Sequence, residues 1–176
     1  MSEVALKVEQ LATHIDTEAG VLRAVDGVDL ELRKGECFAL VGESGCGKSM
    51  TALSIMRLLP EAGRIAGGKV LLGEHDLLAL PEAAMRAVRG RRVAMIFQEP
   101  STALNPVLTV GRQIVEVIER HTETRGEAAR AKALALLDSV GIPDAARRFD
   151  EYPFQLSGGL RQRVMIAGSF ASALPT

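Results

Sequence analysis

The fold is decided by residues 37–59, which read CFALVGESGCGKSMTALSIMRLL. The first five, 37–41, form an apolar run without alternation, a pattern typical of a strand that is buried on both faces of a parallel sheet. A glycine-rich loop over 42–47 follows, and from Lys48 apolar residues recur at helical spacing until Pro60. A buried strand, a glycine-rich loop and a helix in this order predict an α/β fold with a loop that can hold an anion.

Residues 42–49 of this stretch match the phosphate-loop pattern G-x-x-x-x-G-K-[ST]. Glycines let backbone N–H groups turn toward phosphate oxygens, and the following helix adds the positive end of its dipole. We expect Lys48 to reach the β- and γ-phosphates and the Ser49 hydroxyl to bind Mg²⁺. The predicted nucleotide-binding residues of the loop are Gly42, Ser44, Gly45, Cys46, Gly47, Lys48 and Ser49. GTPases and many ATPases share this loop, so the loop alone leaves the kind of nucleotide-binding protein open.

The rest of the chain divides into a strand-rich part before residue 100 and a helical part after it. Further strands are expected at 4–15, 28–32, 69–72 and 92–97, and a further helix at 81–88. Apolar repeats predict helices over 110–120 and 127–140, with Gly141 as a C-cap, and a last helix from Ser157 to about Ala173. We therefore expect a helical insertion over 100–156 in an α/β core.

The composition excludes several classes of protein. The 176 residues carry a formal net charge of -1 and no tryptophan, which argues against nucleic-acid binding through a basic or stacking surface. No stretch approaches the roughly 20 apolar residues of a membrane span, and residues 1–10 lack the apolar region of a signal peptide. The two cysteines, Cys37 and Cys46, indicate neither a disulfide framework nor a metal site. We expect a soluble cytoplasmic protein that reaches any membrane through a partner.

Two later motifs narrow the choice of family. Gln98 follows the predicted strand 92–97, 50 positions after Lys48, and residues 156–163 read LSGGLRQR at the start of the last helix. Alone, Gln98 would be an ordinary surface amide, and residues 157–159 an ordinary helix cap. In this order after a phosphate loop, the motifs resemble those of the ATP-binding subunits of ABC transporters.

The resemblance spans residues 4–167 and is greatest to the branch that imports dipeptides, oligopeptides and nickel. The stretches that carry it are RAVDGV at 23–28, GESGCGKS at 42–49, AMIFQEP at 94–100, LNPVLTVGRQI at 104–114, VGIPD at 140–144 and YPFQLSGG at 152–159. It implies an α/β fold, the P-loop NTPase cassette of the ABC type in partial form, with an antiparallel β subdomain, an incomplete parallel core and a helical insertion. A single partial ATP-binding domain would then span 1–176, with the β subdomain and P-loop core at 1–99, the helical subdomain at 100–156 and the signature helix at 157–176.

The resemblance also assigns roles to residues, with ATP and Mg²⁺ as the implied cofactors. Gln98 matches the glutamine that touches Mg²⁺ and the attacking water, so that Ser49 and Gln98 would share the magnesium site. Ser157, Gly158 and Gly159 match the signature motif, which in the family caps the γ-phosphate of ATP held by a second subunit. A helix N-terminus with small residues and a serine hydroxyl is chemically suited to an anion.

Two departures from the family pattern limit these expectations. Ile15 stands about where the family has an aromatic ring against adenine, so it offers apolar contact without stacking. The family's Walker B strand, whose acidic residues help to hold Mg²⁺ and supply the catalytic base, has no counterpart before Thr176. We therefore expect this chain by itself to contact phosphates without hydrolysing ATP, and to expose apolar surface where central strands are missing.

The function implied by the resemblance is to couple ATP binding and hydrolysis to the import of small peptides, or of nickel, across the cytoplasmic membrane. Its partners would be transmembrane permease subunits, met by residues 100–156, a second ATP-binding subunit and, indirectly, an extracytoplasmic solute-binding protein, with the chain on the inner face of the membrane. Alternatives are a non-catalytic nucleotide-binding or regulatory module, a non-functional fragment, and a soluble ABC-type ATPase of DNA repair or translation. The importer-like residues 104–114 disfavour the last.

Overall fold

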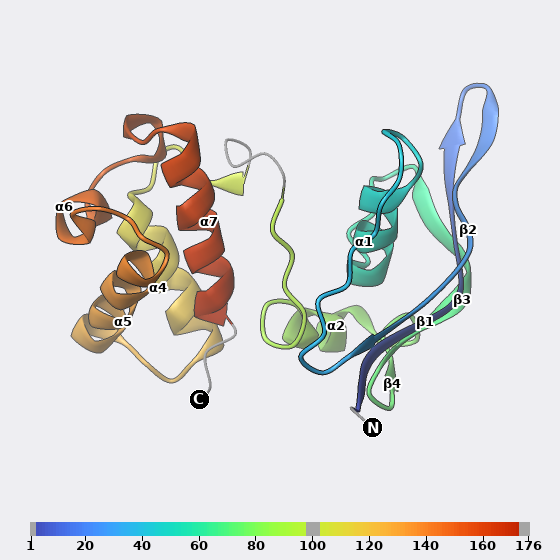
Figure 1. Cartoon of the computed structure of the whole chain (residues 1–176), viewed down its shortest axis with the longest axis horizontal. Coiled ribbons are helices and arrows are strands. Elements are labelled where there is room, and N and C mark those ends of the chain that lie inside the picture. The colour runs from blue at the N-terminus through green and yellow to red at the C-terminus, as the bar shows by residue number, and fades with distance from the viewer. Residues whose placement is uncertain (1–2, 98–102, 173–176) are drawn as a thin grey trace. The chain divides into compact units, whose positions relative to one another are not determined.

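The structure is a computed structural model that describes residues 3–97 and 103–172 (Figure 1). The chain folds as two compact units, Met1–Met85 and Arg86–Thr176. A four-stranded sheet and the helix α1 occupy the first unit, and the helices α4 to α7 occupy the second. The antiparallel β subdomain and the helical region that the sequence predicts are therefore both present.

The sheet of the first unit is antiparallel throughout, in the order β2-β1-β3-β4. Its strands are β1 (Val4–Thr17), β2 (Gly20–Arg33), β3 (Gly63–Leu72) and β4 (His75–Asp76). β1 and β2 form a long hairpin in which Thr17 pairs with Gly20, so the turn between them has two residues. The predicted strands at 4–15, 28–32 and 69–72 are confirmed, and each is longer in the structure than its pattern indicates.

The helix after the phosphate loop, α1 (Lys48–Met56), packs against β1 and β2 (Figure 1). It ends three residues before the predicted end at Leu59, because Arg57 adopts a left-handed conformation with φ 52°. The backbone N–H groups of Arg57 and Leu58 then turn back to the carbonyls of Ser54 and Leu53, at 3.0 and 2.9 Å. This hydrogen-bonded stop is typical of helix C-termini, although a glycine usually occupies the left-handed position.

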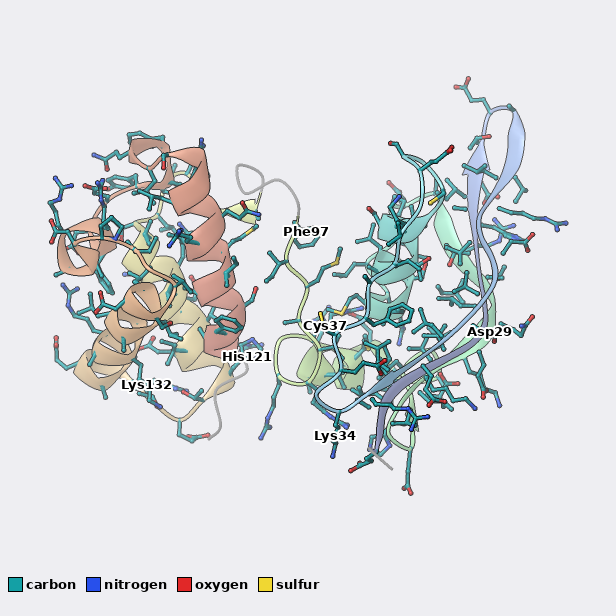
Figure 2. The ribbon with its side chains drawn as sticks, in the orientation of Figure 1. Asp29, Lys34, Cys37, Phe97, His121 and Lys132 are labelled. Carbon is teal, nitrogen blue, oxygen red and sulfur yellow. The ribbon has the colours of Figure 1, made fainter. Side chains whose placement is uncertain are left out.

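Two predicted strands of the parallel core, 37–41 and 92–97, are not formed in the part of the chain that the structure describes. Residues 37–41 have no strand partner, and Phe38 and Val41 are 45% and 89% exposed. In the second segment one parallel bridge joins Arg89 to Val93, and Phe97 is 42% exposed (Figure 2). A buried strand requires neighbouring strands and a cover on both faces, and the described residues supply neither to these segments.

The second unit contains α4 (Val110–His121), α5 (Gly126–Ser139), α6 (Ala145–Phe149), the 3-10 turn η1 (Pro153–Gln155) and α7 (Gly158–Ser172). These helices confirm the predictions at 110–120, 127–140 and from Ser157 onward. The short helix α2 (Glu82–Val88) confirms the prediction at 81–88. α4, α5 and α7 share one apolar core, formed by residues such as Ile114, Leu137 and Val164, each at most 1% exposed.

The ends of these helices are closed by local contacts. The Thr109 hydroxyl accepts a hydrogen bond from the Arg112 backbone N–H at 3.4 Å, and Gly141, the predicted C-cap, follows α5 with φ 73°. The Arg163 guanidinium donates to the carbonyls of Val140 and Gly141 at 2.8 and 3.0 Å, which joins α7 to the end of α5. Within residues 3–97 and 103–172, no helix combines the length and the apolar character that crossing a bilayer requires.

Candidate nucleotide site

The phosphate loop, residues 42–49, begins α1 and depends on its glycines. Gly45 and Gly47 have φ values of 84° and 92°, in the region that side-chain-bearing residues rarely adopt. A Cβ on Gly47 would lie 2.5 Å from the Ala24 carbonyl oxygen, and one on Gly42 would lie 2.6 Å from Cys46 Sγ. Gly45 and Gly47 are therefore required by the path of the backbone, and Gly47 also by the close approach of β2, whereas the contact at Gly42 involves the movable end of the Cys46 side chain.

Backbone donors at the start of α1 are free to bind an anion. Across the described part of the chain, no hydrogen-bond acceptor is found for the N–H groups of Gly47, Lys48 and Ser49. Such groups at a helix N-terminus carry partial positive charge and usually find a partner. Their placement after a glycine-rich turn suits phosphate oxygens.

The Lys48 ammonium group folds back over the loop that precedes it. Its Nζ donates to the carbonyl oxygens of Gly42 and Glu43, at 2.7 and 2.5 Å, and lies 3.4 Å from Cys46 Sγ. Neutral carbonyls are weaker partners for an ammonium group than phosphate oxygens are. The Ser49 side chain at the next position is exposed. The charge and the donors of this loop therefore fit a nucleotide phosphate with its magnesium ion.

A buried hydroxyl pair, which the sequence analysis missed, holds α1 on the sheet. Thr13 Oγ1 of β1 and Ser54 Oγ of α1 lie 2.7 Å apart, and both residues are fully buried. Ser54 Oγ also donates to the Met50 carbonyl at 2.6 Å, and Thr51 Oγ1 donates to the Gly47 carbonyl at 3.0 Å. The Thr13–Ser54 contact therefore holds the last turn of α1 against β1. The sequence signal that could have indicated this pair was a small polar residue among the apolar positions of each element.

Ile15, the predicted contact to the nucleotide base, lies on the face of the sheet that α1 covers. Thr13 and Ile15 are two positions apart in β1 and pair with β3 without a register shift, so their side chains point to the same face. Leu22 of β2 pairs directly with Ile15 and therefore shares that face. Leu22 is 55% exposed and Ile15 is half-buried, which leaves apolar surface open there.

The remaining predicted site residues belong to the second unit. Gln98, expected to contact Mg²⁺, lies outside the described residues. Ser157, Gly158 and Gly159 lie at the start of α7 and are exposed. Ser157 Oγ accepts a long hydrogen bond of 3.4 Å from the Leu160 N–H, as expected of an N-cap. A Cβ on either glycine would meet no atom within 4 Å, so the space beside them is open.

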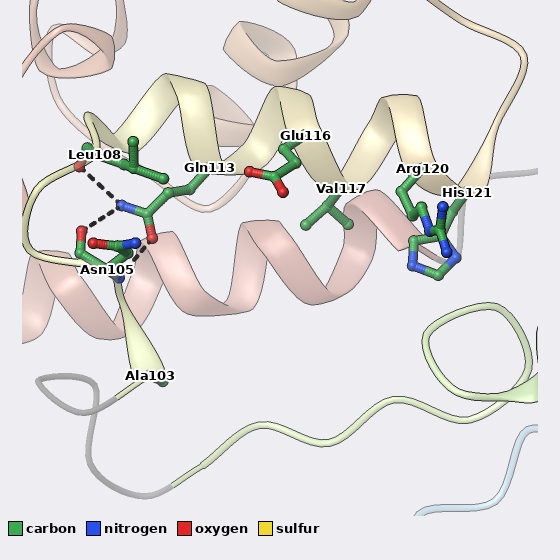
Figure 3. Close-up of a pocket in the computed structure, with 8 residues that line it drawn as sticks. All are labelled: Ala103, Asn105, Leu108, Gln113, Glu116, Val117, Arg120 and His121. Carbon is green, nitrogen blue, oxygen red and sulfur yellow. Dashed lines mark hydrogen bonds between the residues drawn. The ribbon is translucent and has the colours of Figure 1, made fainter. Parts of the chain in front are cut away.

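A hollow of about 380 Å³ lies along one face of α4 (Figure 3). Gln113, Glu116, Val117, Arg120 and His121 point into it from successive turns of the helix. Its rim is held by Gln113, which exchanges hydrogen bonds of 2.9 to 3.0 Å with the backbone of Asn105 and the Leu108 carbonyl. This face carries an acid, two basic groups and an apolar side chain.

Comparisons with known proteins agree with these features. A family model described as "ABC transporter" matches residues 25–175. The dipeptide transport ATP-binding protein DppD of Bacillus subtilis is 49% identical over 166 residues, 94% of this chain and 50% of its own. A probable peptide ABC transporter ATP-binding protein, y4tR, of Sinorhizobium fredii is 49% identical over 171 residues, 97% of this chain and 51% of its own. The chain spans about half the length of the curated relatives it matches.

Solved structures show the same architecture. The dimeric ATP-binding cassette MJ0796, in a post-hydrolysis state bound to ADP and Pi, superposes with a TM-score of 0.83 at 26% identity. The match covers 95% of this chain and 69% of that one. A second dimeric structure of MJ0796, described as a bacterial ABC transporter cassette, gives a TM-score of 0.82 at the same identity and coverage.

Proposed function

This chain belongs to the ABC transporter family, and on that premise we propose that it is the ATP-binding part of a subunit that drives the import of small peptides. The observation that carries the proposal is the phosphate loop, with its free N–H groups and the Lys48 ammonium group turned over it. Relatives named for dipeptide and oligopeptide transport, at 49% and 45% identity, favour peptides over nickel as the cargo.

ATP and Mg²⁺ are the proposed ligands of the phosphate loop. The N–H groups at the start of α1 bind phosphate oxygens, and Lys48 exchanges its two loop carbonyls for the β- and γ-phosphates. The Ser49 hydroxyl and the Gln98 amide would hold Mg²⁺, and the ion would supply positive charge beside the phosphates. Ile15 contacts the nucleotide base through its apolar side chain.

The second half of each ATP site comes, in this proposal, from a second ATP-binding subunit. Ser157, Gly158 and Gly159 place a helix N-terminus, with open space beside it, where the γ-phosphate of the other subunit's ATP can dock. The dimeric cassettes among the similar solved structures support such pairing. Two copies, or this chain and a related one, would then complete two sites together.

Transport also needs a permease, and the helical segment 100–156 is the proposed contact surface. The hollow on α4 supports this assignment, because its mixed polar and apolar lining is accessible (Figure 3). The chain would thereby be held on the inner face of the cell membrane. An extracytoplasmic solute-binding protein would deliver the peptide to the permease and would not touch this chain.

Equilibrium binding of a fluorescent ATP analogue with Mg²⁺ tests the proposal. Lys48→Ala removes the charge that faces the phosphates and is expected to weaken binding by at least about tenfold. Lys34→Ala is the matched control, since Lys34 is an exposed lysine of the same unit that pairs with Glu3 at 2.7 Å. Equal affinities for Lys48→Ala and the unmodified chain would contradict the assignment. Phosphate release from the same samples separates a hydrolytic subunit from a module that only binds nucleotide.

A further inference from the structure

An exposed aromatic pair precedes the signature residues in the second unit. The rings of Tyr152 and Phe154 stack with centroids 5.6 Å apart and planes 10° from parallel. Phe154 is 70% exposed and Tyr152 is 39% exposed. Because Tyr152 covers one face of the Phe154 ring, the exposed area of Phe154 lies mostly on its other face and edge. Together the two rings form an exposed apolar patch just before the signature residues.

The pair is held in place by a short rigid turn. The Tyr152 N–H donates to the Gln155 side-chain oxygen at 2.8 Å, and the Gln155 N–H donates to the Tyr152 carbonyl at 2.9 Å. Pro153, which separates the two aromatic residues in the sequence, is buried. Leu156, two residues after Phe154, is 4% exposed and belongs to the helical core. Phe154 is therefore presented outward by anchored neighbours on both sides, which lowers the entropy lost when a ligand stacks on it.

The position of the ring relative to the signature residues indicates what it can bind. Phe154 stands three residues before Ser157, a separation that spans at most about 10 Å of chain. The start of α7 offers N–H groups and open space for a phosphate, and Phe154 offers a flat apolar surface nearby. A phosphate site and an aromatic surface at such a separation match the two ends of a nucleotide.

At the base-contacting position of the proposed ATP site, this chain has Ile15 in place of an aromatic ring. Ile15 and Leu22, which share the face of the sheet beside the phosphate loop, give apolar contact but no ring. We propose that Phe154, supported by Tyr152, stacks on the adenine or ribose face of the nucleotide bound to the phosphate loop of a second copy of this chain. This inference rests on the proposed function, and it adds a base-recognising residue to the surface that contacts ATP across the dimer.

Ligand comparison isolates the contact to the base. Phe154→Ala should weaken Mg·ATP binding by about tenfold, the usual effect of losing one aromatic–base stack, and leave binding of inorganic tripolyphosphate unchanged. Phe154→Trp should keep or raise the affinity for ATP. Phe170→Ala is the matched control, because Phe170 is a 53% exposed phenylalanine near the other end of α7. Equal ATP affinities for Phe154→Ala and Phe170→Ala would overturn the inference.

Mixing two variants tests whether the contact comes from the second copy. A Phe154→Ala chain retains its phosphate loop, and a Lys48→Ala chain retains its aromatic pair. In an equimolar mixture, each dimer of one Phe154→Ala chain and one Lys48→Ala chain should have one site with high affinity for ATP, namely the site that combines the intact phosphate loop with the intact aromatic pair. Neither variant alone should show such binding. If mixing does not restore the ATP affinity that Phe154→Ala loses, Phe154 does not contact the nucleotide of the second copy. Failure of the proposed function would give a different result. Lys48→Ala and the unmodified chain would bind ATP equally, or the unmodified chain would not bind ATP, and either result would overturn the proposed function together with this inference.

Discussion

The phosphate loop, residues 42–49, and the signature segment, residues 157–159, both place glycines at the start of a helix, but for different reasons. Gly45 and Gly47 have left-handed backbone angles, and a Cβ on Gly47 would also clash with the Ala24 carbonyl. Gly158 and Gly159 lie within α7 and have open space where a side chain would begin. The first pair is required by the fold of its own unit, whereas nothing in the described part of the chain requires the second pair.

This difference indicates where each site is completed. Glycine in a helix costs about 0.5–1 kcal/mol relative to alanine, so glycines without a local reason are explained best by something that approaches from outside. Under the proposed function, that approaching group is the γ-phosphate of a second subunit's ATP. The phosphate loop is thus shaped within one chain, and we propose that the signature segment acquires its role only in a pair.

The largest expected effect that sharpens this comparison comes from Gly47→Ala. It should destabilise the first unit by about 2–3 kcal/mol and abolish nucleotide binding, because it adds both a strained φ and a clash with Ala24. Gly45→Ala is the matched control, since Gly45 has φ 84° but no atom within 4 Å of its Cβ position, and it should cost about 1–2 kcal/mol. Urea unfolding would measure both, and equal losses would show that the contact with Ala24 is unimportant.

A second expected effect is that alkylation of Cys46 blocks the phosphate loop. Cys46 is exposed and its Sγ lies 3.4 Å from Lys48 Nζ, so a bulky adduct should occupy the space of the phosphates. In a Cys37→Ser variant, alkylation should lower ATP affinity by at least about tenfold, and bound Mg·ATP should slow the reaction. The reciprocal Cys46→Ser variant reports on Cys37, which is also exposed, and there ATP should give no protection. An alkylation rate of Cys46 that ATP leaves unchanged would contradict the position of the nucleotide.

The smallest expected effect comes from the signature segment, and it is a gain in stability where the glycine substitutions in the phosphate loop cause a loss. Gly159→Ala should stabilise the second unit by about 0.5 kcal/mol, because the open space accepts a methyl group and alanine favours the helix. It should nevertheless weaken pairing of two chains in the presence of ATP, since the methyl group fills space proposed for the phosphate. Thermal unfolding and sedimentation measure the two effects. A loss of stability in Gly159→Ala would erase the contrast with Gly47→Ala.

Local patterns in the sequence were sufficient to predict most of the elements. The helices α4 and α5 and the start of α7 were predicted within about two residues, because apolar spacing and cap residues such as Gly141 act over a few positions. The phosphate loop was found for the same reason, since its glycines, Lys48 and Ser49 all lie within residues 42–49. The end of α1 was missed because Arg57 takes a left-handed conformation that favours glycine.

Features that depend on distant neighbours could not be predicted in this way. The apolar residues of 37–41 predict a buried strand, yet Phe38 and Val41 are exposed because the described chain places no strand beside them. The pairing of Thr13 with Ser54 joins residues 41 positions apart, and no local pattern links them. Likewise, the sequence contains Tyr152 and Phe154 but does not say whether their rings are buried or outward.

By itself, the sequence determined the family, the phosphate-binding chemistry of residues 42–49 and the order of strands and helices, because these depend on residue types at short, defined spacings. Only the tertiary structure decided which glycines the fold requires, that the residues of 37–41 are exposed, and that Phe154 is held outward beside the signature segment. Burial and close approach are set by residues far apart in the chain, and the same apolar side chain is core or contact surface according to what packs against it.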